Sequence, residues 1–292
     1  MKKKNKIVFE LINDTILCLI GFLCIYPFLY EIFVALSDGR YLAAGQVTFL
    51  PKGINLEAFQ YVLTNPKLDI ALGMKNSFLY TLGGTIAGMV VTYITAYALS
   101  RPQVKCRYFI MAAFTLTWVF EAGIIPTYII MSKFGFIDNP LVMIIPGAIN
   151  TQYLIICKTY IEGLPYELEE AATVDGANQF RILWNVYVPI SKPIVATVGT
   201  FYAVNIWNQY LNPQIYLKSA NLKVIQQVLS DVVISTTSSG EMMQTVMKNG
   251  ISINQYNMKA VAVVIAMAPI VCVYPFVQKC FKSGILIGSV KG

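Results

Sequence analysis

Residues 76–99 read NSFLYTLGGTIAGMVVTYITAYAL, a run without a charged side chain. A helix of this length is long enough to cross the hydrocarbon core of a bilayer, which takes about 20 residues. Hydrophobic residues make up 56 % of the 292-residue chain and charged residues only 13 %, a balance that does not fit a water-solvated surface. The sequence therefore predicts an integral membrane protein.

Five further apolar runs lie along the chain, so we expect an all-α membrane protein with six transmembrane helices in a single domain over residues 1–292. Prolines inside four of the runs predict kinks in a packed bundle, because neighbouring helices can satisfy the carbonyls that proline frees. These prolines are Pro27, Pro126, Pro146 and Pro269. The six predicted spans cover residues 15–36, 76–99, 108–131, 141–157, 194–212 and 260–277.

The net charge of +7 bears on orientation rather than on nucleic acid. The cations are scattered between apolar runs and form no basic and aromatic patch of the kind that binds nucleic acid. Most of the 22 Lys and Arg fall in short segments on one side of the membrane if both termini are cytoplasmic, as the positive-inside rule favours. Lys2 to Lys6 before an apolar run could also mark a signal peptide, but the run is too long for one, which favours a retained span.

The segment most informative about function joins the fourth and fifth runs. Residues 163–177 read GLPYELEEAATVDGA. Pro165 suits the first turn of a helix, the acids after it complement the helix dipole, and Gly176 can adopt the left-handed conformation that ends a helix. A second short helix is expected over about residues 178–188. From the residues alone, the pair of short helices has two interpretations. It is either a rigid element whose slim alanine face another protein contacts, or a solvated hairpin that joins two spans.

This segment resembles the EAA loop of permeases from ATP-binding-cassette (ABC) importers. Glu170-Ala171-Ala172 is followed by Asp175-Gly176-Ala177, and then by Val188-Pro189-Ile190 with Pro193. Other stretches are similar to the carbohydrate-uptake permeases of the maltose type, and the carboxyl-terminal tail is most similar to the branch that handles oligosaccharides and complex glycans. These stretches are Tyr26-Pro27-Phe28, FLPKG at 49–53, Trp207-Asn208 and GILIGSVKG at 284–292.

The resemblance implies a type I ABC importer permease with a cytoplasmic EAA loop over residues 160–193. In that family the loop is a coupling helix that docks on an ATPase. The docking role is thereby carried to Glu170, Ala171, Ala172, Asp175, Gly176 and Ala177.

The resemblance also implies partners and a location. The partners are a second homologous permease in a heterodimer, two cytoplasmic ATPases and an extracellular solute-binding protein, around an oligosaccharide or polysaccharide-fragment cargo. The location is the bacterial cytoplasmic membrane. We expect no cofactor and no metal on this chain, because it lacks the G-x-x-x-x-G-K-[ST] phosphate loop; ATP and Mg²⁺ belong on the ATPases.

Polar side chains inside the predicted spans are candidates for a substrate path, because placing them in lipid is costly. Amides bind sugar hydroxyls, and aromatic rings stack on the apolar faces of pyranoses. The alternative for the amides is that they join helices to one another, and for Trp207 that it packs. The candidates are Glu121, Asn150, Gln152, Asn205, Trp207, Asn208 and Gln209.

Two other classes of function remain open on the residues. An ion-coupled secondary transporter of a polar small solute would use charges at mid-membrane, and Glu121 is the strong candidate. A membrane scaffold or receptor is a third possibility. An enzyme is disfavoured and no catalytic residue is expected, because the chain has no His, no G-x-S-x-G and no metal-ligand cluster.

Overall fold

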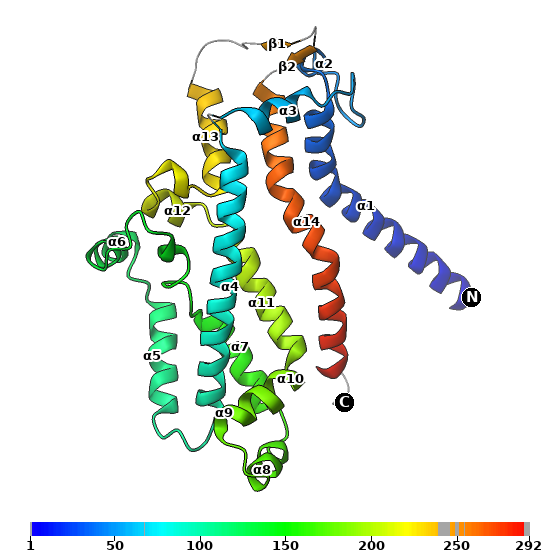
Figure 1. Cartoon of the computed structure of the whole chain (residues 1–292). Helices are drawn as coiled ribbons and strands as arrows, with labels where there is room; N and C mark the ends of the chain where they lie inside the picture. Colours follow the sequence, from blue (N-terminus) through cyan, green and yellow to red (C-terminus); the bar gives the residue numbers. More distant parts are fainter. Residues whose placement is uncertain (1, 67, 239–245, 249–250, 254, 289–292) are drawn as a thin grey trace. The chain divides into compact units, whose positions relative to one another are not determined.

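The computed structural model describes residues 2–66, 68–238, 246–248, 251–253 and 255–288, so the end of the tail at 289–292 lies outside it. Helices dominate the described residues (Figure 1). The chain divides into two compact units, one of Met1–Ile70 with Val228–Ala268 and the other of Ala71–Gln227 with Pro269–Gly292.

The first unit joins the amino-terminal helix to the start of the last helix. Asn257 Nδ2 donates to the carbonyls of Val34 at 3.0 Å and Ser37 at 2.6 Å, and all three residues are buried. These bonds satisfy carbonyls at the end of the first helix, which lack partners within that helix. The elements of this unit are α1 (Lys2–Leu36), α2 (Gly39–Ala43), α3 (Glu57–Thr64), most of α13 (Ile225–Ser238), the antiparallel pair β1 (Val246–Lys248) and β2 (Ile251–Ile253), and the first part of α14 (Gln255–Gly288).

The second unit is built on α4 (Ile70–Ser100). Two glycines let α11 (Lys192–Trp207) approach α4 closely: a Cβ on Gly84 would lie 2.7 Å from Ile206, and one on Gly88 would lie 2.7 Å from the Tyr202 ring. The unit also holds α5 (Arg107–Val119), α6 (Ile124–Lys133), η1 (Pro140–Met143), α7 (Thr151–Glu162), α8 (Glu167–Val174), α9 (Gln179–Ile182), the π-helical η2 (Leu183–Tyr187), α10 (Val188–Ile190), α12 (Leu211–Tyr216) and η3 (Ala220–Leu222).

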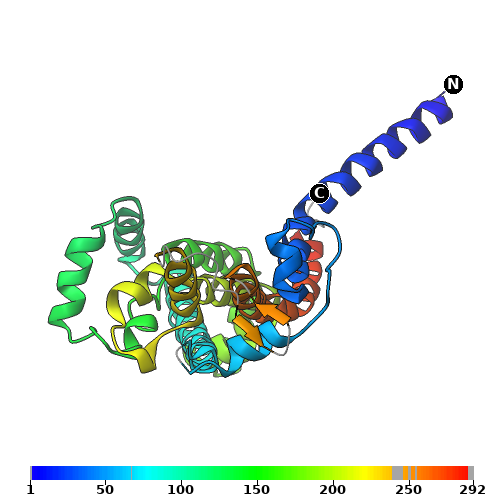
Figure 2. The ribbon, with the colours of Figure 1, turned by 90° about the horizontal axis from the view of Figure 1, so that it is seen from above.

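Three of the predicted spans differ from the structure. The third is not one helix, because the chain breaks between α5 and α6 and the two axes differ by 117°; Figure 2 shows α5 nearly end-on and α6 lengthwise. Gly123 has a φ of +79° there, a conformation that suits glycine and stops a helix. Pro126 then sits in the first turn of α6, where its missing N–H costs little.

The fourth and fifth spans also contain irregular backbone. Over 141–157 the chain forms the 3₁₀ turn η1, then a non-helical stretch through Pro146 and Gly147, and α7 begins only at Thr151. The fifth helix, α11, ends at Trp207 rather than 212, and the short α12 follows after a break. Proline and glycine explain the first departure, and Pro213 explains the second, because in a continuous helix its ring would clash with the carbonyl of Gln209.

Length and composition single out three described helices as able to cross a membrane. They are Phe9–Leu36, Ile70–Ser100 and Gln255–Pro275, and the bent pair α5 and α6 makes a fourth if it counts as one broken span. The first, second and sixth predicted spans therefore correspond to long apolar helices. The count of six stays a prediction.

Candidate functional site

The loop between α7 and α11 forms two short helices that meet at a sharp bend. The first, α8, begins at Glu167 and ends at Val174. Gly176 has a φ of +78°, and the amides of Gly176 and Ala177 donate to the carbonyls of Thr173 and Ala172, both at 3.0 Å. Such bonds satisfy carbonyls at a helix end. The bend expected at Gly176 is present.

The second helix of the loop is composite. Asn178 caps α9, since its Oδ1 accepts from the Arg181 amide at 2.9 Å. The helix then continues through the π turn η2 and the short α10 to Ile190. The helix predicted over about residues 178–188 is present at that position. The π turn within it was not predicted, because no local sequence pattern indicates it.

The bend exposes the tip of α8. Glu170, Ala171, Asp175 and Val174 are exposed, and Val174 reaches 87 %. The sequence predicted that Ala171 and Ala172 together form a slim exposed face. In the structure only Ala171 of the two is exposed. Ala172 is half-buried and packs with Ala177 against the buried cluster between α4, α7 and α11.

A buried ion pair fixes α8 to the end of α4. Arg101, directly after α4, forms a salt bridge with Glu169 of α8, and both are buried. Arg101 Nη1 also donates to the Tyr187 hydroxyl at 2.9 Å, and the guanidinium lies 4.8 Å and 4.7 Å from the centres of the Tyr97 and Tyr187 rings. Burial opposes its charge, but Tyr187 and Glu169 together raise the pKa of Arg101 above its ordinary value. Nothing in the sequence pairs residues this far apart.

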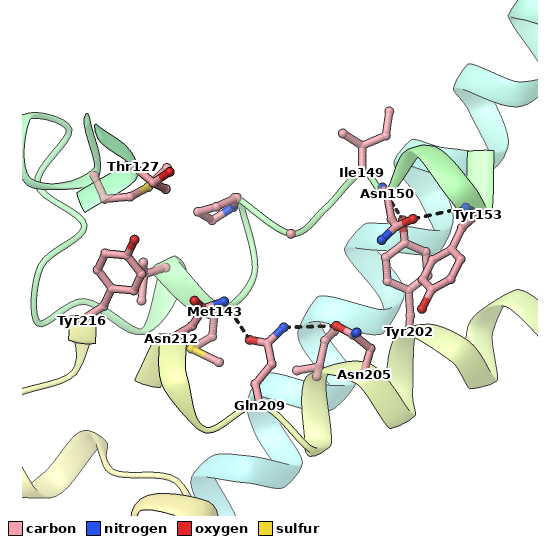
Figure 3. Close-up of a pocket in the computed structure, with 15 residues that line it drawn as sticks. Thr127, Met143, Ile149, Asn150, Tyr153, Tyr202, Asn205, Gln209, Asn212 and Tyr216 are labelled. Carbon is pink, nitrogen blue, oxygen red and sulfur yellow. Dashed lines mark hydrogen bonds between the residues drawn. The ribbon is translucent and has the colours of Figure 1, made fainter. Parts of the chain in front are cut away.

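A polar cavity of about 280 Å³ lies elsewhere in the same unit (Figure 3). The cavity lies between α6, η1 with the irregular stretch after it, α7, α11 and α12. Gln209 stands in a row of amides: its Nε2 donates to Asn205 Oδ1 at 3.2 Å, and its Oε1 accepts from Asn212 Nδ2 at 3.5 Å. Tyr153, Tyr202 and Tyr216 add aromatic surface to the lining.

Three of the predicted path residues meet in this cavity, namely Asn150, Asn205 and Gln209. Asn150 also has a structural role, because its Oδ1 caps α7 by accepting from the amides of Gln152 at 2.9 Å and Tyr153 at 3.3 Å. Asn150 therefore lines the cavity and caps α7; its role in a substrate path stays a prediction.

The other four predicted path residues lie outside the lining. Glu121 is exposed at the bend between α5 and α6, Gln152 is exposed on α7, and Asn208 is exposed just after α11. Trp207 is buried and lines a separate, apolar cavity of about 180 Å³ with Phe78 and with Pro269, Ile270, Val273 and Tyr274. In the structure, Trp207 therefore packs among apolar side chains.

Tyr202, Asn212 and Tyr216 also line the cavity and were not among the predicted path residues. In the sequence, Tyr202, Asn205 and Gln209 follow one another at intervals of three and four, the spacing of one helical face, although α11 itself ends at Trp207. Asn212 and Tyr216 continue the spacing onto α12. Searching for tyrosine as well as amides at this spacing would have found the lining.

Long apolar helices, a partly open polar cavity and an exposed helical hairpin are typical of a membrane transport subunit. Residues 88–286 match the family described as the binding-protein-dependent transport system inner membrane component, and the chain belongs to this family. The type I ABC permease fold and the membrane location predicted from the sequence are thereby confirmed.

Relatives resemble the chain over nearly all its length. Protein LplC of Bacillus subtilis (strain 168) is 36 % identical over 288 residues, 98 % of this chain and 95 % of that protein. The polygalacturonan/rhamnogalacturonan transport system permease protein YtcP of the same organism is 32 % identical over 290 residues, 99 % of this chain and 100 % of that protein.

A solved structure shows the same fold. It is a bacterial ABC transporter involved in the import of the acidic polysaccharide alginate, with a TM-score of 0.84 and 29 % sequence identity, covering 93 % of this chain and 96 % of that one.

Proposed function

We propose that this chain is one of two permease subunits that carry oligosaccharides or polysaccharide fragments into the cytoplasm, with ATP hydrolysed by partner subunits. The observation that carries the proposal is the polar cavity of the second unit. Its row of amides supplies both donors and acceptors for sugar hydroxyls, and its tyrosines supply surfaces for sugar rings. YtcP and the alginate importer, whose names refer to polysaccharides, support this cargo class.

The size of the cavity fits part of a longer saccharide. About 280 Å³ is close to the lower end of ligand sites, which span roughly 300–1,000 Å³. The lining residues come from α6, η1 with the irregular stretch after it, α7, α11 and α12, so a relative movement of these elements changes the shape of the cavity. A cavity that reshapes without losing its hydrogen-bonding groups suits a path along which a polar chain advances.

The exposed tip of α8 is the proposed docking site for an ATPase. Glu170 and Asp175 offer carboxylates to cations of the partner, while Ala171 and Val174 offer small apolar surface between them. Gly176 orients this tip by ending α8 at the bend, and Ala172 and Ala177 anchor it from beneath. ATP and Mg²⁺ are bound by the ATPases in this arrangement.

The proposed assembly is a heterodimer with a second, homologous permease, two ATPases and an external solute-binding protein. In the bacterial cytoplasmic membrane the chain crosses six times with both termini inside. The irregular backbone of 144–150 then lies at membrane depth, which is tolerated where such backbone lines a polar cavity.

Purification of the native complex through a tag on this chain tests the proposal. We expect an ATPase, a second permease and a solute-binding protein to co-purify, and ATP hydrolysis in lipid nanodiscs to rise when the binding protein is loaded with oligosaccharide. The control is the same binding protein without sugar. A complex without an ATPase, or hydrolysis indifferent to the loaded binding protein, contradicts the proposal.

A further inference from the structure

An ion pair between residues far apart in the sequence joins the end of α4 to α8, the helix of the proposed docking site. Arg101 and Glu169 are separated by a long stretch of sequence, yet their side chains pair where water is excluded. Burying a charge costs free energy that its partner must offset, so removing one partner leaves the other buried and uncompensated. The pair therefore resists any separation of α8 from α4.

Neighbouring contacts strengthen the same junction. The Tyr187 hydroxyl contacts both members of the pair, donating to Glu169 Oε2 at 3.3 Å while it accepts from Arg101. Tyr97 of α4 donates to Gln179 Oε1 at 2.6 Å, and Gln103 donates to the Tyr166 hydroxyl at 3.0 Å. The whole bend, and not α8 alone, is held to the end of α4.

Farther from that end, the same helix contacts a residue that lines the polar cavity. Thr92 Oγ1 lies 2.6 Å from the Tyr202 hydroxyl, which accepts from the Asn150 amide at 3.0 Å. Helix α4 is continuous from Thr92 to Ser100, about 12 Å at the usual rise per residue, and Arg101 follows directly. An α-helix without a break transmits a displacement along its axis with little loss.

We propose that Arg101 is a positioning residue that makes α8 and α4 move as one body, so that displacement of α8 reaches Tyr202 and Asn150 in the cavity. The inference rests on the proposed docking of an ATPase at α8. It adds that transport is coupled to hydrolysis through the Arg101–Glu169 pair. Without the pair, α8 still docks, but the flanking Tyr97–Gln179 and Gln103–Tyr166 bonds hold the bend to α4 less firmly, so less of its displacement reaches α4.

The test measures the coupling ratio, which is saccharide translocated per ATP hydrolysed, in proteoliposomes of the full complex. For Arg101→Gln we expect ATP hydrolysis to persist while the coupling ratio falls by at least about 5-fold. A change of about 5-fold corresponds to the smallest coupling free energies that are common between two sites of a protein. Lys105→Gln is the matched control, an exposed cation in the same turn, and its ratio should equal that of the wild type. A wild-type ratio in Arg101→Gln overturns the inference.

A second variant keeps the test decisive if a lone buried carboxylate disturbs assembly. The double variant Arg101→Met with Glu169→Leu leaves no uncompensated charge, so we expect it to assemble. Its coupling ratio should also fall, and a ratio like that of the wild type overturns the inference.

Cysteine cross-linking from Ala171→Cys to the ATPase separates the two claims. No cross-link in an otherwise wild-type complex removes the docking proposal and this inference with it. A cross-link of equal yield in the wild-type and Arg101→Gln backgrounds, together with a lowered ratio, supports both. Equal yield with an unchanged ratio leaves docking standing and removes the role of Arg101.

Discussion

Thr92 on α4 and Tyr202 on α11 share a hydrogen bond of 2.6 Å between their hydroxyls at a buried contact beside the polar cavity. The close approach depends on Gly88, because a Cβ there would meet the Tyr202 ring. Tyr202 also accepts from the backbone amide of Asn150, where α7 begins. One phenol thus joins α4, α7 and α11 at the wall of the cavity.

Replacing Tyr202 by Phe should lower the stability of the bundle. The change leaves the Thr92 hydroxyl and the Asn150 amide without this partner, and a buried polar group that loses its partner costs about 1–3 kcal/mol. Thermal unfolding in detergent measures the effect. Tyr153→Phe is the control, since its hydroxyl makes one long bond of 3.4 Å to the Phe201 carbonyl; an equal loss in both variants would contradict the account.

Replacing Asn205 by Ala should weaken cargo binding without disturbing assembly. Asn205 lines the cavity and accepts from Gln209, so its loss removes one hydrogen-bonding group from the proposed sugar path and leaves the Gln209 amide without that partner. We expect the KM for uptake to rise up to about 10-fold, the equivalent of one hydrogen bond. Gln152→Ala, an exposed amide outside the lining, and Trp207→Phe, in the apolar cavity, should leave KM unchanged. A larger rise in KM for Trp207→Phe than for Asn205→Ala would contradict this prediction and would indicate that the substrate path follows the other face of α11.

Replacing Gly176 by Leu should disrupt ATPase docking through the backbone alone. Nothing lies within 4 Å of a Cβ at Gly176, so the effect comes from its φ of +78°, where a residue with a side chain pays about 1–2 kcal/mol. We expect less ATPase to co-purify with the membrane-inserted chain. Gly176→Asn should retain more, because Asn visits this region more readily.

Gly163→Ala serves as the matched control for Gly176. Gly163 lies in the same loop but has a φ of −79°, which any residue adopts. Its ATPase recovery should match that of the wild type. Equal recovery for Gly163→Ala and Gly176→Leu would show that the bend is not needed for docking.

Asp138 should make stability depend on pH in the acidic range. Its carboxylate accepts from the Ser219 hydroxyl, from the Ser219 amide at 2.7 Å and from the Lys218 amide at 2.9 Å, and these bonds lower the pKa of Asp138 below 3.8. A lowered pKa means that the carboxylate stabilises the fold above about pH 4, and that this contribution is lost as the pH falls through the folded-state pKa.

The measurement is the difference in Tm between the wild type and Asp138→Asn as a function of pH. We expect a constant difference between pH 7 and 5 that shrinks as the pH drops below 4. Glu121→Gln, at the exposed bend, controls for the loss of a surface carboxyl. A difference that stays constant to pH 3 would contradict the role of these hydrogen bonds.

Local chemistry predicted the parts of the fold that depend on nearby residues. The apolar runs predicted α1, α4 and α14, and Gly176 predicted the bend after α8, because hydropathy and left-handed backbone are properties of short stretches. The break before α6 was not predicted, because Pro126 was interpreted as a kink within one span and the left-handed backbone of Gly123 was not foreseen.

The cavity and the buried ion pair could be predicted only in part, because they depend on contacts between distant segments. The sequence marked Asn150, Asn205 and Gln209 as costly in lipid, but it gave no means to separate them from Gln152 or Asn208. Glu169 looked like one of several acids at a helix start. Its pairing with Arg101 depends on the packing of α8 against the end of α4. No local sequence pattern predicts this packing.

The most direct test of the central claim is uptake of labelled oligosaccharide into proteoliposomes that contain the full complex, with ATP on the ATPase side and an ionophore present. Saccharide import by an ABC permease predicts uptake that needs ATP, needs the binding protein and persists when ion gradients are collapsed. Uptake that continues without ATP and stops with the ionophore would contradict it and would favour the ion-coupled alternative.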